Sequence, residues 1–459
     1  MGHNPLKSKV ISMKLFGTDG IRGTFNQHPM TVETALRVGQ AVAATFATPS
    51  KHTVIIGRDT RQSGQALSSA LAAGVMSMGA HVALAGVIPT PGVAFLTAAH
   101  DEAALGVVIS ASHNPFEDNG IKLFNEDGFK FDEAVEARIE ALVADTDALQ
   151  SHLEAASTVG TMNHIPHAAT RYLGFLKEAC PVDLSGLRLV ADASNGAASS
   201  LAEPLLRGAG AELTLINAAP NGININAGCG SEHPDEVQAL VTSSGASAGL
   251  AFDGDADRLI CVDETGEIVS GDQVIAIVAE YYRTQGILAN DTVVTTVMSN
   301  MGLSACLEGK GVTHTKSAVG DRHVMLAMKE QGAVVGGEDS GHMIFLDRHT
   351  TGDGLLSALL LLTVLKETGK PLSELKQAMT VFPQVLINVD VAEKKPLEEL
   401  TAVPKAIDEA EKALNGKGRT LVRYSGTQKM LRVMVEGEDA DLTRYWAEAI
   451  AEAVRREIG

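Results

Sequence analysis

The fold is decided by residues 53–85, which read TVIIGRDTRQSGQALSSALAAGVMSMGAHVALA. The β-branched run at 53–57 predicts a strand, the Ala-rich stretch from Gln65 predicts a helix, and 81–85 predicts a second strand. Gly79 stands where that helix should end, as helix C-caps prefer. Short apolar strands that alternate with helices are typical of parallel strands covered by helices on both faces.

The same order of elements returns twice further along the chain. Strand, helix and strand are predicted at 187–191, 197–207 and 212–216, and again at 291–297, 302–308 and 312–315. Beyond residue 381 the order changes to strand, helix, two strands and helix, at 385–391, 396–414, 420–424, 430–436 and 442–456. We therefore predict an α/β protein of three similar mixed-sheet domains and a C-terminal α+β domain around a central cleft, with bounds 13–160, 161–263, 264–380 and 381–459.

Composition narrows the class of partner. The 459 residues carry a formal net charge of −19, which repels nucleic acid and anionic membranes, so neither is an expected partner. An anionic substrate would need a local cluster of Arg and Lys. The four cysteines form no CxxC pair, residues 1–12 lack the apolar region of a signal peptide, and the apolar stretch 355–365 is too short for a membrane span. We expect a cytoplasmic protein with reduced thiols, and a homodimer is an open alternative for its oligomeric state.

The first candidate site follows an apolar strand expected at 105–109. Residues 109–115 read ISASHNP, and residues 119–122 read NGIK. Small residues and an Asn-Pro turn at a strand end would present a serine hydroxyl on a tight, exposed loop. A Ser/Asn turn without a role is the alternative, and Ser-x-Ser alone leaves both open. No base–acid pair is ordered as in serine hydrolases, which disfavours that class.

The second candidate site is DGDADR at 253–258, directly after the apolar residues 249–252. Three carboxylates at alternate positions are costly beside an apolar strand unless a cation neutralises them, and oxygen ligands indicate Mg²⁺ or Ca²⁺. An EF-hand calcium loop would need Gly where Arg258 stands, and helices where strands are predicted. Solvated turn acids are the weaker alternative. Because Mg²⁺ readily takes phosphate oxygens as extra ligands, this site connects with the first if Ser112 carries a phosphoryl group.

Two further polar loops complete the set. Residues 336–342 read GGEDSGH, in which Glu338 and Ser340 offer an acceptor and a hydroxyl to neighbouring sugar hydroxyls. Residues 423–428 read RYSGTQ, and Arg432 stands on the following strand. Hydroxyls, backbone N–H groups and an arginine make a compact phosphate nest, with an ordinary β-turn as the alternative.

Four motifs in this order resemble the α-D-phosphohexomutase family over essentially the whole chain from Met13. They read SASHNP at 110–115, DGDADR at 253–258, GEDSGH at 337–342 and RYSGT at 423–427. Each motif alone is only suggestive, whereas four in the family's order and approximate spacing are highly specific. The resemblance implies three similar α/β domains and a fourth of different fold around one cleft.

The resemblance also implies roles for single residues. Ser112 would be the phosphoserine, and one Mg²⁺ would be held by its phosphate together with Asp253, Asp255 and Asp257. Lys122 and Arg22 match further active-site positions, His113 and Arg258 would flank the reacting phosphate, and Arg61 would support the loop. Glu338 and Ser340 would hold sugar hydroxyls, and the phosphate that is not transferred would be held by Arg423, Ser425, Gly426 and Thr427.

Family members move a phosphoryl group between two positions of a hexose or hexosamine phosphate through a bisphosphorylated intermediate, and a sugar 1,6-bisphosphate is the expected activator. Further motifs resemble the branch that interconverts glucosamine 6-phosphate and glucosamine 1-phosphate on the route to UDP-N-acetylglucosamine. They read KLFGTDGIRG at 14–23, NINAGCGS at 224–231, VGDR at 319–322 and TTGDG at 350–354. The alternatives are a mutase of mannose or glucose phosphates, a silent phosphosugar-binding protein, and a phosphatase that loses its phosphoryl group to water.

Two features qualify the resemblance. The phosphate loop usually reads RPSGTEP, and here Tyr424, Gln428 and Lys429 replace its Pro, Glu and Pro, which removes two fixed φ angles. Asp339 stands where this branch usually has Gln.

Lys122 is the expected general acid/base. Crowding by Arg22 or Arg258 would lower its pKa toward the working range.

Overall fold

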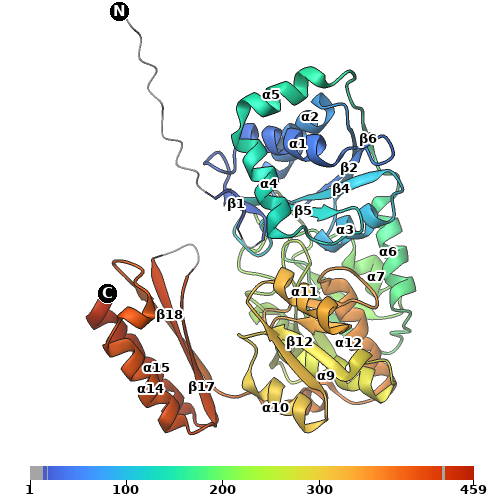
Figure 1. Cartoon of the computed structure of the whole chain (residues 1–459). Coiled ribbons are helices and arrows are strands. Elements are labelled where there is room, and N and C mark those ends of the chain that lie inside the picture. The colour runs from blue at the N-terminus through green and yellow to red at the C-terminus, as the bar shows by residue number, and fades with distance from the viewer. Residues whose placement is uncertain (1–13, 18, 426–428) are drawn as a thin grey trace, which may run out of the picture. The chain divides into compact units, whose positions relative to one another are not determined.

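The computed structural model describes residues 14–17, 19–425 and 429–459 (Figure 1). These residues form four β-sheets with helices between their strands. The described residues fall into two units. One unit contains the chain through Val297 and Thr315–Leu375, and the other contains Met298–His314 and Lys376–Gly459. The four domain boundaries expected from the sequence stay predictions.

The first sheet has six strands and is mostly parallel at its centre. Its strands are β1 (Ile21–Thr24), β2 (Thr53–Arg58), β3 (His81–Val87), β4 (Ala103–Ile109), β5 (Asp118–Asn125) and β6 (Met162–His164), in the spatial order β1-β5-β4-β2-β3-β6. Its helices are α1 (Val32–Phe46), α2 (Ser63–Ser77), α3 (Thr90–Ala98), α4 (Glu133–Ala144) and α5 (Thr146–Ala155). Strand β2 is parallel to β3 and β4, whereas β5 is antiparallel to β4.

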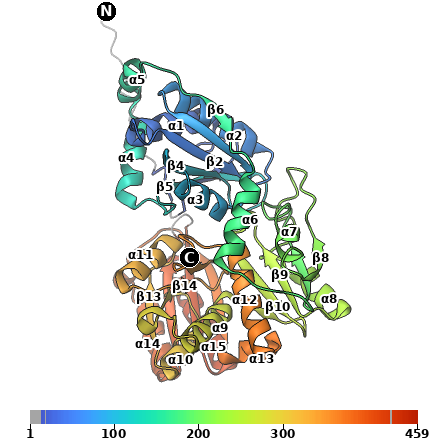
Figure 2. The ribbon, with the colours of Figure 1, turned by 90° about the vertical axis from the view of Figure 1, so that its right-hand side faces the viewer.

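The second sheet repeats this scheme with five strands. They are β7 (Arg188–Asp192), β8 (Glu212–Ile216), β9 (Ala248–Phe252), β10 (Leu259–Asp263) and β11 (Ile268–Val269), in the order β11-β10-β9-β7-β8. The helices that precede or connect these strands are α6 (Ala168–Ala179), α7 (Ala202–Leu206) and α8 (Asp235–Ser244). Helix α6 leads from the first sheet toward the second (Figure 2). Strand β7 is parallel to β8 and β9, and β10 is antiparallel to β9.

The third sheet has four strands, β12 (Thr292–Thr296), β13 (Thr313–Ser317), β14 (Val335–Gly337) and β15 (Met343–Phe345), in the order β13-β12-β14-β15. Strand β14 is parallel to β12 and antiparallel to β15. The helices of this part are α9 (Gly271–Thr284), α10 (Met301–Gly309), α11 (Asp321–Gln331), α12 (Gly354–Thr368) and α13 (Leu372–Leu375), with a 3-10 turn at Ala289–Asp291. Helix α12, which contains the apolar stretch 355–365, is buried almost throughout.

The fourth sheet is antiparallel and has three strands, β16 (Gln384–Asp390), β17 (Gly418–Tyr424) and β18 (Met430–Gly437), in the order β16-β18-β17. Its helices are α14 (Ala402–Leu414) and α15 (Ala440–Ile458), with 3-10 turns at Lys376–Ala378 and Leu397–Glu399. The apolar sides of both helices pack on this sheet around Val403, Val433 and Ile450. The predicted fold class, three similar mixed sheets and an α+β part, is confirmed.

Three of the predicted motifs occupy the same place in three repeated sheets. Ser112 lies between β4 and β5, the three aspartates lie between β9 and β10, and Glu338 lies between β14 and β15. In each sheet this is the turn at which the chain leaves a parallel strand and returns antiparallel. One local architecture therefore presents all three polar loops.

Two predicted helices are shorter than expected. The helix expected at 197–207 is helical only over Ala202–Leu206, because the backbone before it binds elsewhere: the Ala197 N–H donates to the Gly254 carbonyl at 2.8 Å. The helix expected at 396–414 begins only at Ala402, and Pro404 lies in its first turn, where proline is tolerated.

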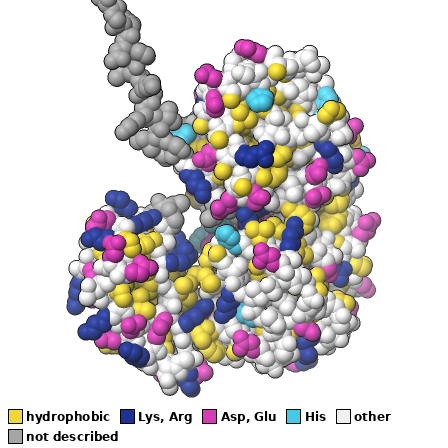
Figure 3. Space-filling view, in the orientation of Figure 1, with side chains coloured by type: hydrophobic (Ala, Val, Ile, Leu, Met, Phe, Trp, Pro, Cys, Tyr) yellow, Lys and Arg dark blue, Asp and Glu magenta, His cyan; other side chains and the backbone are white. Residues whose placement is uncertain are grey.

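No helix in the described part of the chain is both long and apolar enough to span a bilayer. On the face shown in Figure 3, Lys and Arg side chains are interspersed with Asp and Glu on both units.

Two glycines let α1 and α2 approach closely. A Cβ atom on Gly39 would lie 2.1 Å from the Leu71 carbonyl oxygen, and one on Gly74 would lie 2.0 Å from the Leu36 carbonyl oxygen. We expect Gly74→Ala to lower the melting temperature, because the helices must separate at a cost of about 1–3 kcal/mol, which outweighs the roughly 1 kcal/mol that Ala gains in helix propensity. Thermal unfolding followed by circular dichroism measures the change.

Gly174→Ala is the matched control. A Cβ at Gly174, inside α6, meets no atom within 4 Å, so this variant should gain helix propensity and melt slightly higher. Equal rises in both variants would contradict the close-packing argument.

Candidate functional site

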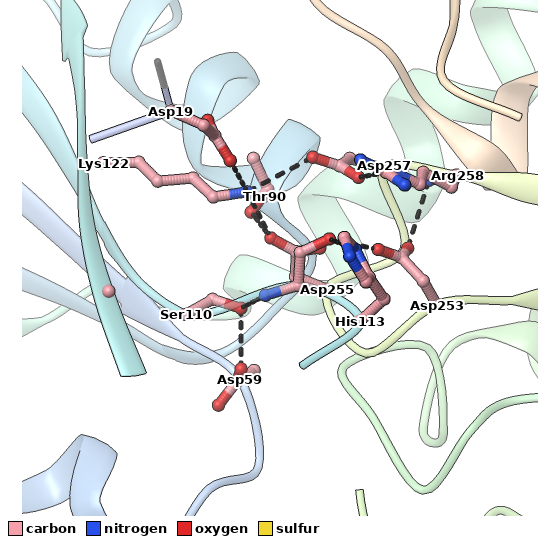
Figure 4. A network of polar contacts seen from close by, with 12 residues as sticks. Asp19, Asp59, Thr90, Ser110, His113, Lys122, Asp253, Asp255, Asp257 and Arg258 are labelled. Atoms are coloured by element: carbon pink, nitrogen blue, oxygen red, sulfur yellow. Dashed lines mark hydrogen bonds and ion pairs between the residues drawn. The ribbon is translucent and has the colours of Figure 1, made fainter. Parts of the chain in front are cut away.

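Ser112 is buried at the end of β4 in a strained backbone conformation. Its φ of +53° lies in the left-handed region that side chains rarely adopt, and its residue is 1% exposed. The hydroxyl Oγ donates to Asp253 Oδ2 at 2.5 Å and lies 3.3 Å from His113 Nδ1. The structure thus brings the predicted serine directly against the predicted metal loop, whose three aspartates are labelled in Figure 4.

Asp253, Asp255 and Asp257 form a buried cluster of three carboxylates. Each offers one oxygen, and these atoms all lie within 4.8 Å of one another. Burial and the charges of Asp257 and Asp255 raise the pKa of Asp253 well above its ordinary value. Gly254 is required in this loop, because a Cβ there would lie 2.6 Å from the Ser112 carbonyl oxygen.

The carboxylate cluster fits a divalent cation with oxygen ligands. Asp255 Oδ1 and Asp257 Oδ1 are buried and accept no hydrogen bond from the described residues, so each leaves a lone pair for a ligand. Three carboxylates without sulfur or imidazole ligands suit Mg²⁺ better than a softer metal. The residue types and the unpaired oxygens therefore agree with the metal site expected from the sequence.

Lys122, on β5, lies among these carboxylates rather than beside arginines alone. Its Nζ is 2.8 Å from Asp255 Oδ2, 3.3 Å from Asp257 Oδ2 and 3.3 Å from Asp19 Oδ2. The expectation of a lowered pKa is wrong. Burial disfavours the charged ammonium, but the three carboxylates outweigh that effect and raise the pKa of Lys122 above its ordinary value.

Asp19 is a site residue that the sequence argument missed. It forms ion pairs with Arg22, Lys122 and Lys130, at 2.5 Å from Lys130 Nζ, and despite burial these cations lower its pKa well below the ordinary value. The available signal was its place inside the motif KLFGTDGIRG at 14–23, three residues before Arg22. Thr90 was also missed. It is the first residue of α3, its hydroxyl donates to Asp255 Oδ2 at 2.6 Å, and no distinctive sequence marks it.

Arg258 and His113 are both drawn close to Asp253 in Figure 4. The Arg258 Nε is 3.9 Å from Asp257 Oδ1, and its backbone N–H donates to Asp253 Oδ1 at 3.1 Å. Burial and the positive charge of Arg258 lower the pKa of His113. His113 therefore lies beside the hydroxyl that would carry phosphate, and Arg258 adjoins two of the carboxylates; the roles of both residues stay predictions.

The loop after β14 approaches the same cluster. His342 lies between two carboxylates, with Nδ1 3.6 Å from Asp257 Oδ1 and Nε2 3.5 Å from Asp321 Oδ2. Burial opposes its charge, but these carboxylates raise the pKa of His342. Glu338 Oε1 accepts the Gly320 N–H at 3.0 Å, and the buried Ser340 Oγ has no hydrogen-bond partner among the described residues.

Asp339, the departure from the usual Gln, has a structural role. Its Oδ1 accepts the Asp272 N–H at 3.2 Å, in the first turn of α9. A carboxylate is favourable at a helix N-terminus, so this contact accounts for an acid at the position.

The predicted phosphate nest lies in the other unit. Arg423 on β17 stands directly opposite Arg432 on β18, and burial together with the Arg432 charge lowers the pKa of Arg423. The Ser425 N–H donates to the Met430 carbonyl at 2.9 Å, while Gly426, Thr427 and Gln428 lie outside the described residues. Tyr424, which replaces the usual proline, donates from its hydroxyl to the Lys395 carbonyl at 2.6 Å.

Models of the four phosphoglucomutase/phosphomannomutase domains match the chain in order. Domains I, II and III, of alpha/beta/alpha type, match residues 13–150, 170–266 and 270–382, and the C-terminal domain matches 386–453. The chain belongs to the phosphoglucomutase/phosphomannomutase family.

Similar proteins cover almost the whole phosphohexomutase chain. A phosphoglucosamine mutase of Desulforapulum autotrophicum is 50% identical, with 96% of this chain and 99% of that protein covered. A phosphoglucosamine mutase of Geotalea daltonii is 49% identical, with 97% and 98% covered. A crystal structure of a phosphoglucomutase/phosphomannomutase family protein from Burkholderia thailandensis shares the fold, with a TM-score of 0.79, 24% identity, and 96% and 97% of the two chains covered.

Mg²⁺ should stabilise this phosphohexomutase against thermal unfolding, because only the folded chain gathers the three carboxylates. Binding of this kind contributes about 2.7 kcal/mol when free Mg²⁺ exceeds the dissociation constant 100-fold. Asp257→Asn should reduce the Mg²⁺-dependent rise in melting temperature, since it removes one ligand charge. Asp183→Asn, at an exposed acid far along the chain, is the control and should keep the full rise. Identical rises in all three proteins would place Mg²⁺ binding elsewhere.

Proposed function

We propose that this phosphohexomutase interconverts glucosamine 6-phosphate and glucosamine 1-phosphate, as a phosphoglucosamine mutase, in the supply of UDP-N-acetylglucosamine in the cytoplasm. The observation that carries the chemistry is the 2.5 Å contact between Ser112 Oγ and Asp253 inside a buried carboxylate cluster. The choice of sugar is supported by the names of relatives that are about half identical over nearly the whole chain.

Phosphorylated Ser112 gives its phosphoryl group to the free hydroxyl of the substrate. The Oγ–phosphorus bond breaks, the sugar oxygen–phosphorus bond forms, and the product of this half-reaction is the 1,6-bisphosphate. After the sugar has reoriented, its other phosphoryl group returns to Ser112 by the reverse step. A sugar 1,6-bisphosphate added from outside would phosphorylate Ser112 in the same way and so act as activator.

Asp253, Asp255 and Asp257, with the phosphate on Ser112, would hold one Mg²⁺. When bound, this ion supplies positive charge to the phosphoryl oxygens. The chain itself supplies further positive charge through Lys122, Arg22 and Arg258, which all lie at the carboxylate cluster. Catalysis of this kind depends mainly on positioning and electrostatic stabilisation.

Lys122 is the proposed proton carrier. Its raised pKa keeps it protonated, so it can give a proton to Ser112 Oγ as that oxygen leaves phosphorus. The same amine then receives the proton that the attacking sugar hydroxyl loses, which balances the half-reaction. His113 lies 3.3 Å from Ser112 Oγ and would orient the phosphate rather than carry the proton.

The remaining predicted residues would hold the sugar. Ser340 Oγ, buried without a hydrogen-bond partner in the described chain, and the Glu338 carboxylate would bind hydroxyls. The phosphate that is not transferred would be held by Arg423, Ser425, Gly426 and Thr427. Two facing arginines support an anion site there, because like charges directly opposite are destabilising without a counterion.

Turnover of glucosamine 6-phosphate, mannose 6-phosphate and glucose 6-phosphate, each with Mg²⁺ and a trace of the matching bisphosphate, tests this proposal. We expect the highest kcat/KM for the amino sugar and no measurable turnover by Ser112→Ala, since that variant has no oxygen to carry the phosphoryl group. Ser151→Ala, on the exposed side of α5, is the control and should match the parent protein.

Each other outcome selects a different function. A preference for mannose or glucose phosphate would keep the mechanism and change the substrate. Release of inorganic phosphate without isomerisation would indicate a phosphatase, and binding without either reaction would indicate a phosphosugar-binding protein.

Arg423→Ala should raise the KM for the phosphosugar roughly 10- to 100-fold, because a hydrogen bond to a charged group contributes about 1.5–3 kcal/mol. The transfer of phosphate from a bisphosphate to Ser112 should still be detectable by mass spectrometry of the intact protein. Arg455→Ala, exposed on α15 of the same unit, is the control. An unchanged KM in Arg423→Ala would remove this arginine from the phosphate site.

A further inference from the structure

Arg61 lies fully buried beneath the Ser112 loop and uses its whole guanidinium there. Its Nε donates to Asp59 Oδ2 at 2.8 Å, and its two terminal nitrogens donate to the backbone carbonyls of Ser112, Asn114, Pro115 and Asp118. A guanidinium has five N–H donors in a fixed plane, and all five find acceptors here. This confirms that Arg61 supports the loop, as the sequence led us to expect.

Asn226 binds two of the same carbonyl groups. Its Nδ2 donates to the Ser112 carbonyl at 2.8 Å and to the Asn114 carbonyl at 3.0 Å. Arg61 Nη2 donates to these two oxygens at 3.0 Å and 2.7 Å. Because a carbonyl oxygen has two lone pairs, the two side chains together saturate both acceptors.

Asn226 also adjoins the carboxylate loop. Its Nδ2 would lie 2.8 Å from a Cβ placed on Gly254, and its backbone N–H donates to the Ser194 carbonyl at 2.9 Å. The residue comes from the segment NINAGCGS at 224–231, between β8 and α8, and adopts a left-handed φ of +57°. It therefore lies where the loop of Ser112 and the loop of Asp253 meet, and it belongs to neither.

The hydrogen bonds around Ser112 show why Arg61 and Asn226 are important for its backbone conformation. Ser112 is held in a left-handed conformation, and its N–H donates to Ser110 Oγ at 3.0 Å, which in turn donates to Asp59 Oδ2 at 2.6 Å (Figure 4). The carbonyl side of the same residue is held only by Arg61 and Asn226 among the described residues. A strained conformation persists when its surroundings fix it from several sides.

We propose that Asn226 is a positioning residue of the phosphoryl transfer, which with Arg61 fixes the Ser112 loop against the carboxylate loop. The inference rests on the proposed role of Ser112 as phosphoserine. Removing the amide would let Ser112 relax away from Asp253 while leaving the sugar-binding loops intact. The expected signature is therefore a loss of kcat without an equal change in KM.

Asn226→Ala and Asn226→Asp test this. The first removes the donor, and the second keeps the shape but faces two carbonyls with an acceptor. We expect kcat to fall about 10- to 100-fold, as displacements of about 1 Å in an active site can do, with KM changed less than threefold. Single-turnover transfer from phosphorylated Ser112 to the sugar should slow by the same factor. Arg61→Lys should show the same split, because an ammonium offers only three donors.

Asn290→Asp is the matched control. Asn290 also has a left-handed φ, of +55°, and its Nδ2 also joins two carbonyls, Gln331 at 2.9 Å and Gly332 at 3.3 Å, near the end of α11. This variant should keep the kcat of the parent protein. Its melting temperature, compared with those of the Asn226 and Arg61 variants, shows how much stability each substitution removes.

The outcomes separate the two proposals. Unchanged kcat in both Asn226 variants, with Ser112→Ala inactive, would overturn the positioning role alone. The same role would fall if Asn290→Asp lost as much kcat, since general loosening would then explain the effect. Normal turnover by Ser112→Ala would overturn the proposed function, and the positioning role with it.

Discussion

Three carboxylates buried beside Ser112 set the constraint on which the rest of the site depends. Burial of such charges is costly in any protein, and more so in a chain with a net charge of −19. Lys122 contacts Asp255 and Asp257, and despite burial their pKa values are lowered, whereas Asp253 accepts hydrogen bonds from Ser112 and the Arg258 backbone and has a raised pKa. Lys122 thus compensates the negative charges of Asp255 and Asp257, whereas Asp253, which contacts Ser112, lacks a comparable cation among the described residues.

Repetition explains how distant segments reach one site. In each of three sheets the chain turns from a parallel strand into an antiparallel one, and the functional residues stand at that turn. The strands are stable because their apolar side chains are buried on both faces, so the turns can be polar and strained without loss of the fold. One scaffold, used three times, thus presents three different polar loops: one with Ser112, one with the three aspartates, and one with Glu338 and Ser340.

Local patterns predicted the elements and the motifs, and the resemblance predicted that Ser112 lies beside the three aspartates, whereas other contacts between distant segments were not predicted. The strand expected at 212–216 is correct at both ends, because its apolar run is bounded by turn residues. The helix expected at 197–207 is shorter than predicted because the Ala197 N–H donates to the Gly254 carbonyl, a tertiary contact. Asp19 and Thr90 were not predicted as site residues because their contacts are also tertiary. The predicted direction of the Lys122 pKa shift was wrong because it considered the arginines and not the carboxylates that lie beside Lys122.

One unit contains a cluster of negatively charged side chains, and the other contains a pair of positively charged ones. The carboxylates of one unit leave buried oxygens without hydrogen-bond donors from the described chain, and Arg432, opposite Arg423 in the other unit, has a buried Nε without an acceptor there. Neither arrangement is favourable for an isolated protein, since unpaired buried polar groups and facing like charges both cost free energy. A divalent cation would satisfy the first cluster, and a phosphate would satisfy the second. Each cluster therefore suits one of the proposed ligands: a metal ion for the carboxylates, and the phosphate of a sugar for the arginines.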